Sequence, residues 1–242
     1  MEEGHIEAGG DSFRTSIIKF LNEVEKEKNQ LFKLSKMCEQ FNFQRRRFYD
    51  VINVFEVIGC CQHETVDTIK WLGKDNILKT IQKLSMANGV NNELVKLKEI
   101  IPKEKCDSIG KITQLCILLF LSLKRQTLNI RQIAIYMSRG KNVLKTILCK
   151  LYQISFILSA AEILEKTSVP CEIRLCDKYF NFLTNCTNDI DRYSISSMLV
   201  QAPKADELYI ELRRKEFEKY CKYIAMKQVV TERPKKMRIV LV

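Results

Sequence analysis

Residues 45–59 have the sequence Arg-Arg-Arg-Phe-Tyr-Asp-Val-Ile-Asn-Val-Phe-Glu-Val-Ile-Gly. The apolar residues of this stretch recur at helical spacing and form one stripe: Phe48, Val51, Ile52, Phe55 and Ile58. Four polar residues fall on the other side: Arg46, Tyr49, Asp50 and Asn53. Gly59 follows the last apolar residue, where a helix is expected to end. The stretch predicts a helix with a buried stripe and an exposed, arginine-rich N-terminus, the form of a helix that enters a DNA major groove. These residues alone leave open a charged helix start on an ordinary helical domain.

The flanking sequence predicts a small domain around this helix. Ser12 is expected to cap a helix that runs to about Lys26. A second helical stripe follows: Leu31, Leu34, Met37, Cys38 and Phe41. After Gly59, residues 60–62 and 68–72 are expected to form two strands, with His63 to Asp67 as a solvated turn and Trp71 in the core. Three helices and a hairpin make a winged helix.

The motif Arg46-Arg47-Phe48-Tyr49-Asp50 resembles the Arg-Arg-x-Tyr-Asp motif of the E2F/DP transcription-factor family. Residues 12–24 and 31–41 are similar to the first and second helices of that family. The segment Thr68-Ile69-Lys70-Trp71-Leu72-Gly73 is similar to its final wing strand. The resemblance covers residues 12–73 and implies a winged-helix domain that binds double-stranded DNA.

A second, weaker resemblance to the same domain covers residues 108–176. Residues 108–123 resemble the family's first helix, and residues 128–137 its second, with Asn129 as the N-cap. Residues 141–154 take the place of the recognition helix, and residues 156–160 and 171–176 are expected to form a wing. Aligning residues 151–157 on the end of the family's helix puts Asn142 to Thr146 at the motif positions, without arginine, tyrosine or aspartate. The expected fold is therefore mostly α, with tandem winged-helix domains and a C-terminal helix, as in atypical family members.

The predicted organisation has six segments: a flexible N-terminus (1–11), the first winged helix (12–73), a helical linker (74–107), the degenerate second winged helix (108–176), a C-terminal helical region (177–228) and a basic tail (229–242). In the linker, helices are expected at 75–86 and near 94–100, too short for a convincing coiled coil. A long helix is expected to open at Pro203, with Leu212 and Phe217 inward and Arg213 among its charged residues. Residues 233–238, Arg-Pro-Lys-Lys-Met-Arg, have the composition of a nuclear-import signal or a phosphate-binding tail.

Composition excludes several classes of function. The run from Ile112 to Leu123 is too short to span a bilayer, and residues 1–10 do not resemble a signal peptide. Ten scattered cysteines and only two histidines favour reduced, mostly buried thiols over disulfides or a zinc site. No glycine-rich phosphate loop or catalytic set is recognisable. We therefore expect no enzyme, no cofactor, no metal and no small-molecule substrate.

The net charge of +11 is unevenly distributed. Residues 1–73 carry −2, residues 74–107 carry +2, residues 108–176 carry +7 and residues 177–242 carry +4. The arginines of the first recognition helix are therefore a local feature, and most non-specific attraction for phosphates is expected from the rest of the chain.

Two functions remain open from the sequence. The first is a nuclear, sequence-specific DNA-binding protein that regulates transcription and reads a GC-rich site through the first recognition helix. The second is a non-catalytic winged-helix docking or DNA-binding subunit of a larger nuclear complex, which the acidic balance of residues 1–73 and the lack of an extended acidic tail favour. The candidate DNA-binding residues are Arg45, Arg46, Arg47, Tyr49, Asp50, Asn53, Arg139, Lys141 and Lys145. The two winged helices are expected to pack through the linker helices as an intramolecular pseudo-dimer, with the second copy contacting either the DNA backbone or protein.

Overall fold

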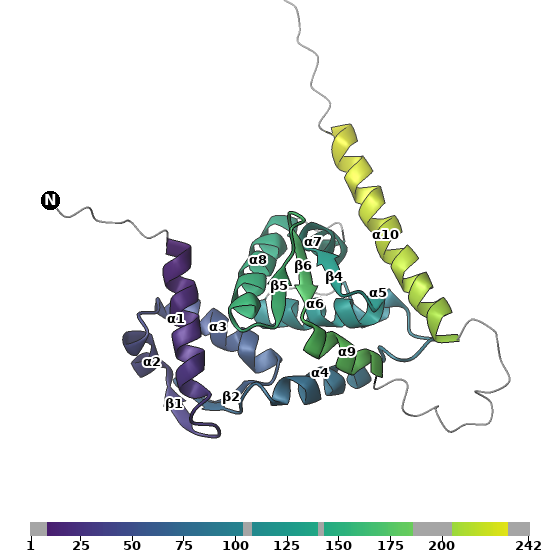
Figure 1. Cartoon of the computed structure of the whole chain (residues 1–242). Coiled ribbons are helices and arrows are strands. Elements are labelled where there is room, and N and C mark those ends of the chain that lie inside the picture. Colours follow the sequence, from purple (N-terminus) through teal and green to yellow (C-terminus); the bar gives the residue numbers. More distant parts are fainter. Residues whose placement is uncertain (1–8, 104–107, 140–142, 186–204, 232–242) are drawn as a thin grey trace, which may run out of the picture.

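The structure, a computed structural model, describes residues 9–103, 108–139, 143–185 and 205–231 (Figure 1). Most of it is helical, with two small antiparallel sheets. The first unit, residues 9–71, contains three helices and one sheet. Its elements are α1 (Gly9–Val24), β1 (Leu31–Lys33), α2 (Leu34–Gln40), α3 (Arg45–Val57), β2 (Cys61–Thr65) and β3 (Thr68–Trp71).

Aromatic rings form the centre of the first unit. Phe20 lies edge-on to Phe48 and to Trp71, with ring centroids 5.1 Å and 5.7 Å apart, and Phe55 approaches Trp71 at 5.8 Å. All four side chains are fully buried. The indole Nε1 of Trp71 donates to Glu25 Oε1 at 3.0 Å, which satisfies its only polar atom. The expected place of Trp71 in the core is confirmed.

Three local predictions for the first unit are wrong. Leu31 begins a strand and not a helix, because β1 pairs with β3 and Leu31 lies opposite Lys70. Ser12 lies inside α1, which begins at Gly9, so it is not the helix cap. His63 lies within β2 and not in the turn, since β2 continues to Thr65. The Nδ1 of His63 is 3.0 Å from Glu56 Oε2, which holds the imidazole against α3.

The second unit, residues 109–175, has the same order of elements. It consists of α6 (Ile109–Leu123), β4 (Thr127–Asn129), α7 (Ile130–Ser138), α8 (Leu144–Ala160), β5 (Leu164–Lys166) and β6 (Glu172–Leu175). The strand order is β4-β6-β5, which corresponds to β1-β3-β2 in the first unit. Asn129 caps α7 as expected, since its side chain accepts from the Arg131 N–H at 3.0 Å.

The expected wing strand at residues 156–160 is wrong, because these residues form the last turns of α8. Buried side chains continue at helical spacing to the end of this helix: Ile154, Ile157, Leu158 and Ala160. The strand that pairs with β6 is Leu164–Lys166, with Leu164 opposite Leu175.

The ends of α3 and α8 are built in the same way. After α3, Gly59 has φ +81°, and its N–H donates to Glu56 O. After α8, Glu162 has φ +61°, and its N–H donates to Ser159 O. The following residues make matching 2.9 Å hydrogen bonds to the helix, Cys60 N to Phe55 O and Ile163 N to Leu158 O. Matching the two helices at these ends makes four pairs of positions equivalent: Arg46 and Cys149, Arg47 and Lys150, Tyr49 and Tyr152, Asp50 and Gln153.

The two units differ in the segment before this shared helix end. The first strands begin 96 residues apart, at Leu31 and Thr127, whereas the residues with positive φ are 103 apart, at Gly59 and Glu162. The second unit therefore has seven additional residues between β4 and the end of α8. As a result α8 begins one turn earlier than α3 when the helices are matched at their ends.

The two units pack directly against each other through two helices from each. α3 lies against α6 and α8, and α1 lies against α8. Since α6 and α8 correspond in element order to α1 and α3, each unit offers the same pair of helices, as in a two-fold symmetric interface. The Gln153 Nε2 donates to Asp50 Oδ2 at 2.7 Å. Because these two positions are equivalent, the approximate two-fold axis passes close to this hydrogen bond.

The contacts around this axis are close on both sides. On one side, the Arg14 guanidinium reaches the Ser159 carbonyl at 3.5 Å. On the other, Gly110 lies against α3: a Cβ at this position would be 3.2 Å from Val57 Cγ2 and 3.7 Å from the Asn53 carbonyl oxygen. The absence of a side chain at Gly110 lets the two helices approach, and the direct contact differs from the expected packing through the linker helices.

The remaining helices cover the outside of α6 and the second unit. They are α4 (Asn76–Ala87), α5 (Leu97–Ile100), α9 (Asp177–Asn185) and α10 (Ala205–Thr231). α4 packs on α6 and α9, while α10 packs on α5, α6 and α7. Figure 1 shows the long α10 at the edge of the molecule, beside α5. Pro203 lies outside the described residues.

Arg213 fixes α10 to the loop after α4. The guanidinium donates to the carbonyl oxygens of Val90 at 2.6 Å and of Asn92 and Val95 at 2.8 Å each. Only 3% of Arg213 is exposed, and this burial lowers the pKa of its guanidinium. Arg213, which the sequence places among the charged residues of this helix, is therefore buried, because the carbonyls of the loop replace water as its partners. Leu212, expected to point inward, is exposed.

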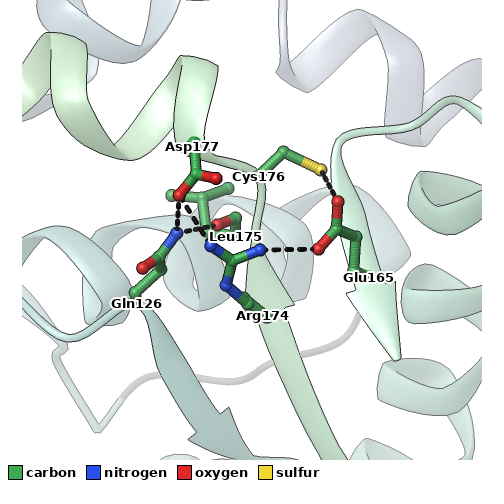
Figure 2. A network of polar contacts seen from close by, with 6 residues as sticks. All are labelled: Gln126, Glu165, Arg174, Leu175, Cys176 and Asp177. Atoms are coloured by element: carbon green, nitrogen blue, oxygen red, sulfur yellow. Dashed lines mark hydrogen bonds and ion pairs between the residues drawn. The ribbon is translucent and has the colours of Figure 1, made fainter. Parts of the chain in front are cut away.

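A polar network ties the second sheet to α9 (Figure 2). Arg174 on β6 forms ion pairs with Glu165 on β5 at 2.8 Å and with Asp177 at the start of α9 at 2.6 Å. The Gln126 amide donates to Asp177 at 2.6 Å and to the Leu175 carbonyl at 3.0 Å. Gln126, and then Arg174, lower the pKa of Asp177. Because Asp177 is largely exposed, the network orders this end of the sheet more than it stabilises the fold.

The cysteines described in the structure are all free, and no group of potential ligands among the described residues could hold a metal ion. Burial raises the pKa of Cys116 and of Cys221 to about 12, so both remain thiols at neutral pH. None of the described helices combines the length and apolar character needed to cross a membrane.

Candidate nucleic-acid interface

Three exposed arginines stand at the start of α3. The helix begins at Arg45, after Gln44 in an extended conformation. Arg45, Arg46 and Arg47 are all exposed, whereas Phe48 and the following apolar residues are buried against the core. The core therefore holds the helix from behind while the arginine side chains face solvent.

A corner of the first unit ties α3 to α2 and to the wing; we call it the wing corner, formed by Ser35, Arg45, Tyr49, Val66 and Asp67. The Tyr49 hydroxyl donates to the Val66 carbonyl at 3.3 Å. Asp67 accepts from the Ser35 N–H at 3.1 Å and from the Ser35 hydroxyl at 2.7 Å. Arg45 lies 3.9 Å from Asp67 and 5.9 Å from the Tyr49 ring, and the contact with Tyr49, and then the charge of Asp67, raise its pKa. These contacts fix the first turn of α3 relative to the wing.

Arg47 belongs to a stack of side chains that reaches the second unit. Its guanidinium carbon is 5.7 Å from the centroid of the Phe13 ring. Phe13 in turn stacks on Phe156 of α8, with centroids 5.8 Å apart and 11° between the planes. Arg46 makes no hydrogen bond or ion pair with the residues that the structure describes. The two arginines of the motif therefore differ, because Arg47 is supported from the side and Arg46 is not.

Comparison with known protein families finds a match over the first unit. Residues 10–73 match the model of the E2F/DP family winged-helix DNA-binding domain. The first unit is therefore similar to an E2F/DP-type winged helix. The match includes α1 to β3, so it covers the exposed arginines and the whole wing corner. No curated protein matches the chain.

Two candidate residues of the first unit, Asp50 and Asn53, are half-buried and lie where α3 contacts the second unit. Asp50 accepts the hydrogen bond from Gln153 described above. Asn53 is half-buried, and its backbone carbonyl lies on the side of α3 that faces Gly110 of α6. Helical spacing places these polar residues on one side of α3. In the structure, that side is divided between solvent and the second unit. Its first turn is exposed, and its next turns contact the second unit.

The three candidate residues of the second unit have different surroundings. The Arg139 guanidinium donates to the Ile101 carbonyl and lies 4.8 Å from the Tyr136 ring, so it holds the linker onto α7. Its Nε is buried without a partner among the described residues. This geometry does not favour a DNA contact by Arg139. Lys141 lies outside the described residues, and Lys145 is exposed in the first turn of α8.

The structure also corrects the alignment of the second unit. The positions equivalent to the motif are Cys149 to Gln153, with the sequence Cys-Lys-Leu-Tyr-Gln, and not Asn142 to Thr146. The tyrosine is therefore present, as Tyr152, and Lys150 is a cation at the position of Arg47. Tyr152 also contacts the turn between β5 and β6, since its hydroxyl lies 3.1 Å from Cys171 Sγ. The pair Lys-x-Tyr was the sequence signal for this alignment, but it was too short to be recognised by itself.

Proposed function

We propose that the chain is a nuclear, non-catalytic, sequence-specific DNA-binding protein that regulates transcription and reads a GC-rich site through α3. The observation that carries the proposal is the exposed Arg46–Arg47 pair at the start of α3 in a domain of the E2F/DP type. An arginine guanidinium can donate two hydrogen bonds to O6 and N7 of guanine, which no other base accepts in the same geometry. Each such contact supplies about 1–3 kcal/mol of base discrimination.

The wing corner supports this use of α3. Tyr49 and Asp67 connect the start of α3 to the wing and to α2, so the helix can enter a groove in one orientation. Orientation matters because a bidentate contact tolerates little displacement of the guanidinium. In this proposal Tyr49 is a positioning residue, and Asp50 joins the two units and does not contact bases.

We also propose that the second unit is a divergent winged helix and that one chain occupies one duplex as an intramolecular pseudo-dimer. The direct packing of α3 on α6 and of α1 on α8, with equivalent residues paired at the axis, supports this arrangement. Residues 74–107 tether the two units, so each is always present at a high effective concentration for the other. Arg46 and Arg47 then read bases, and the second unit contacts the DNA backbone.

The decisive experiment is a binding titration on GC-rich and AT-rich duplexes of equal length at two salt concentrations. The Arg46→Ala/Arg47→Ala variant is expected to lose the preference for the GC-rich duplex and to keep its fold by circular dichroism. The charge-matched control is Lys79→Ala/Lys83→Ala on α4, where both lysines are exposed, and it is expected to keep the preference. Preference that survives in the folded arginine variant would overturn the assignment of α3 as the base-reading helix.

Stoichiometry tests the pseudo-dimer. Light scattering of the chain with a short duplex is expected to give one chain per duplex. DNA binding that appears only after other proteins are added would favour the second function, a docking subunit of a larger complex. The net charge of −2 in residues 1–73 favours this second function, because an acidic domain attracts DNA phosphates poorly.

A further inference from the structure

The second unit differs from the first in charge at the wing corner. In the first unit the Leu34 N–H donates to the Asp67 carbonyl at 2.9 Å, and in the second the Ile130 N–H donates to the Cys171 carbonyl at 2.8 Å. These bonds make Asp67 and Cys171 equivalent. The residues that follow Leu34 and Ile130 are Ser35 and Arg131. The Ser35–Asp67 pair is thus replaced by Arg131 and Cys171, so this corner has gained a cation and lost an anion.

Arg131 is exposed and lies at the corner formed by Tyr152 and Cys171. The Tyr152 hydroxyl, which lies 3.1 Å from Cys171 Sγ, and then Cys171 raise the pKa of the Arg131 guanidinium. Tyr152 is 40% exposed and occupies the position of Tyr49. No carboxylate of the described residues forms an ion pair with Arg131, whereas Arg45 in the first unit faces Asp67. Among the described residues, the positive charge of Arg131 therefore has no carboxylate partner.

The exposed side of α8 extends this corner. Lys145, Thr146 and Cys149 are exposed, and Lys145, Cys149 and Tyr152 follow each other at the spacing of one helix face. We call Arg131, Lys145, Thr146 and Tyr152 the second basic face. It offers two cations and two hydroxyl donors, which are the groups that proteins use on phosphate oxygens.

We propose that the second basic face binds phosphates of the same duplex that the first unit reads, without selecting bases. This inference rests on the proposed function and names the groups that would carry the backbone contact. Cys149 stands where the first unit has Arg46, so the second unit lacks the guanidinium pair that distinguishes guanine. Residues 108–176 carry a net charge of +7, against −2 for residues 1–73, which favours contact with an anionic backbone.

The test is the salt dependence of binding to the GC-rich duplex. Each phosphate contact contributes about 0.9 to the slope of log affinity against log salt, so Arg131→Ala/Lys145→Ala is expected to lower the slope by about 1.8. Raising the salt from about 50 mM to about 200 mM weakens binding of both proteins. With the lower slope, the fold-loss of affinity of the variant is expected to be about twelve times smaller than that of the unmodified chain. The preference for GC-rich over AT-rich DNA is expected to stay unchanged. Lys79→Ala/Lys83→Ala, with the same loss of charge on α4, is the control and is expected to keep the slope.

The outcomes separate this inference from the proposed function. If the unmodified chain binds GC-rich DNA selectively but Arg131→Ala/Lys145→Ala keeps the full slope, the second basic face does not contact the backbone and the inference is wrong. A loss of base preference in this variant would also overturn it, because it would show that the face selects sequence. If the unmodified chain shows no preference at all, the proposed function itself fails. Tyr152→Phe removes only the hydroxyl and keeps the ring, so it is expected to keep the fold. Its salt slope is expected to change by less than about 0.9, the contribution of one phosphate contact.

Discussion

Phe156→Ala is expected to lower the discrimination between bases at the position that Arg47 contacts. Binding to the DNA phosphates is expected to stay unchanged. Phe156 belongs to the second unit, yet it stacks on Phe13, and Phe13 lies under the guanidinium of Arg47. Removing the ring leaves Phe13 without the partner that keeps it flat against α8. Arg47 then loses a fixed surface to lie on, while Arg46 keeps its surroundings.

The expected size follows from the two contacts in this stack. A cation–π contact at an exposed site is worth about 0.5–1 kcal/mol, and a stacked aromatic pair about 0.5–1.5 kcal/mol beyond its buried area. Phe13 keeps a second neighbour, Phe43, with ring centroids 5.9 Å apart, so it does not become free. We therefore expect the lower end, a loss of about 1 kcal/mol, which is about five-fold in discrimination at the base contacted by Arg47.

The assay is competition between duplexes that differ at single G·C pairs within the site. The variant is expected to lose discrimination at one position, and its salt slope is expected to match that of the unmodified chain. Phe156→Tyr keeps the ring and is expected to behave as the unmodified chain. Leu148→Ala, also on α8 and partly buried against the core but outside the stack, controls for general loosening of the helix.

Two results would refute the reasoning. Equal loss of affinity on every duplex would mean that Phe156 only holds the units together. Unchanged discrimination at every position in a folded variant would mean that the stack has no effect on Arg47.

Three further predictions concern stability and are measured by urea denaturation. Gly59→Ala is expected to destabilise by about 2–4 kcal/mol, because the new Cβ would lie 2.0 Å from Thr80 Oγ1 at φ +81°; a small effect would mean that this turn relaxes easily. Glu162→Gly, at the equivalent position with φ +61°, is expected to stabilise by about 1 kcal/mol, and a loss of stability would count against the left-handed conformation there. Arg213→Met is expected to cost about 3 kcal/mol, because buried carbonyls such as that of Val90 lose their donor; an unchanged midpoint would show that water replaces the guanidinium.

Helical spacing predicted α3 well because its stripe is local. Phe48, Val51, Ile52, Phe55 and Ile58 are all buried, and the chain turns at Gly59 with positive φ. Each of these features depends on a few neighbouring residues. The same reasoning placed Trp71 in the core.

The short strands β1 and β4 could not be predicted from their own residues. Each has three residues, and each is a strand only because β3 or β6 lies beside it, as Leu31 pairs with Lys70 and Thr127 with Arg174. Such a pairing depends on segments about 40 to 50 residues apart. The apolar spacing of Leu31 and Leu34 fitted a helix equally well.

The misplaced motif in the second unit has a different cause. Seven residues are two turns of an α-helix, so moving an alignment by seven positions leaves every apolar residue on the same face. The buried stripe of α8 therefore agreed with both alignments, one with Asn142 to Thr146 and one with Cys149 to Gln153 at the motif. Only the chain reversal after α8 distinguishes them, because Glu162 repeats the positive φ and the hydrogen bond of Gly59. Glutamate gives no sequence signal for that conformation, whereas glycine does. Tyr152 and Gln153 could thus be matched to Tyr49 and Asp50 only through the backbone.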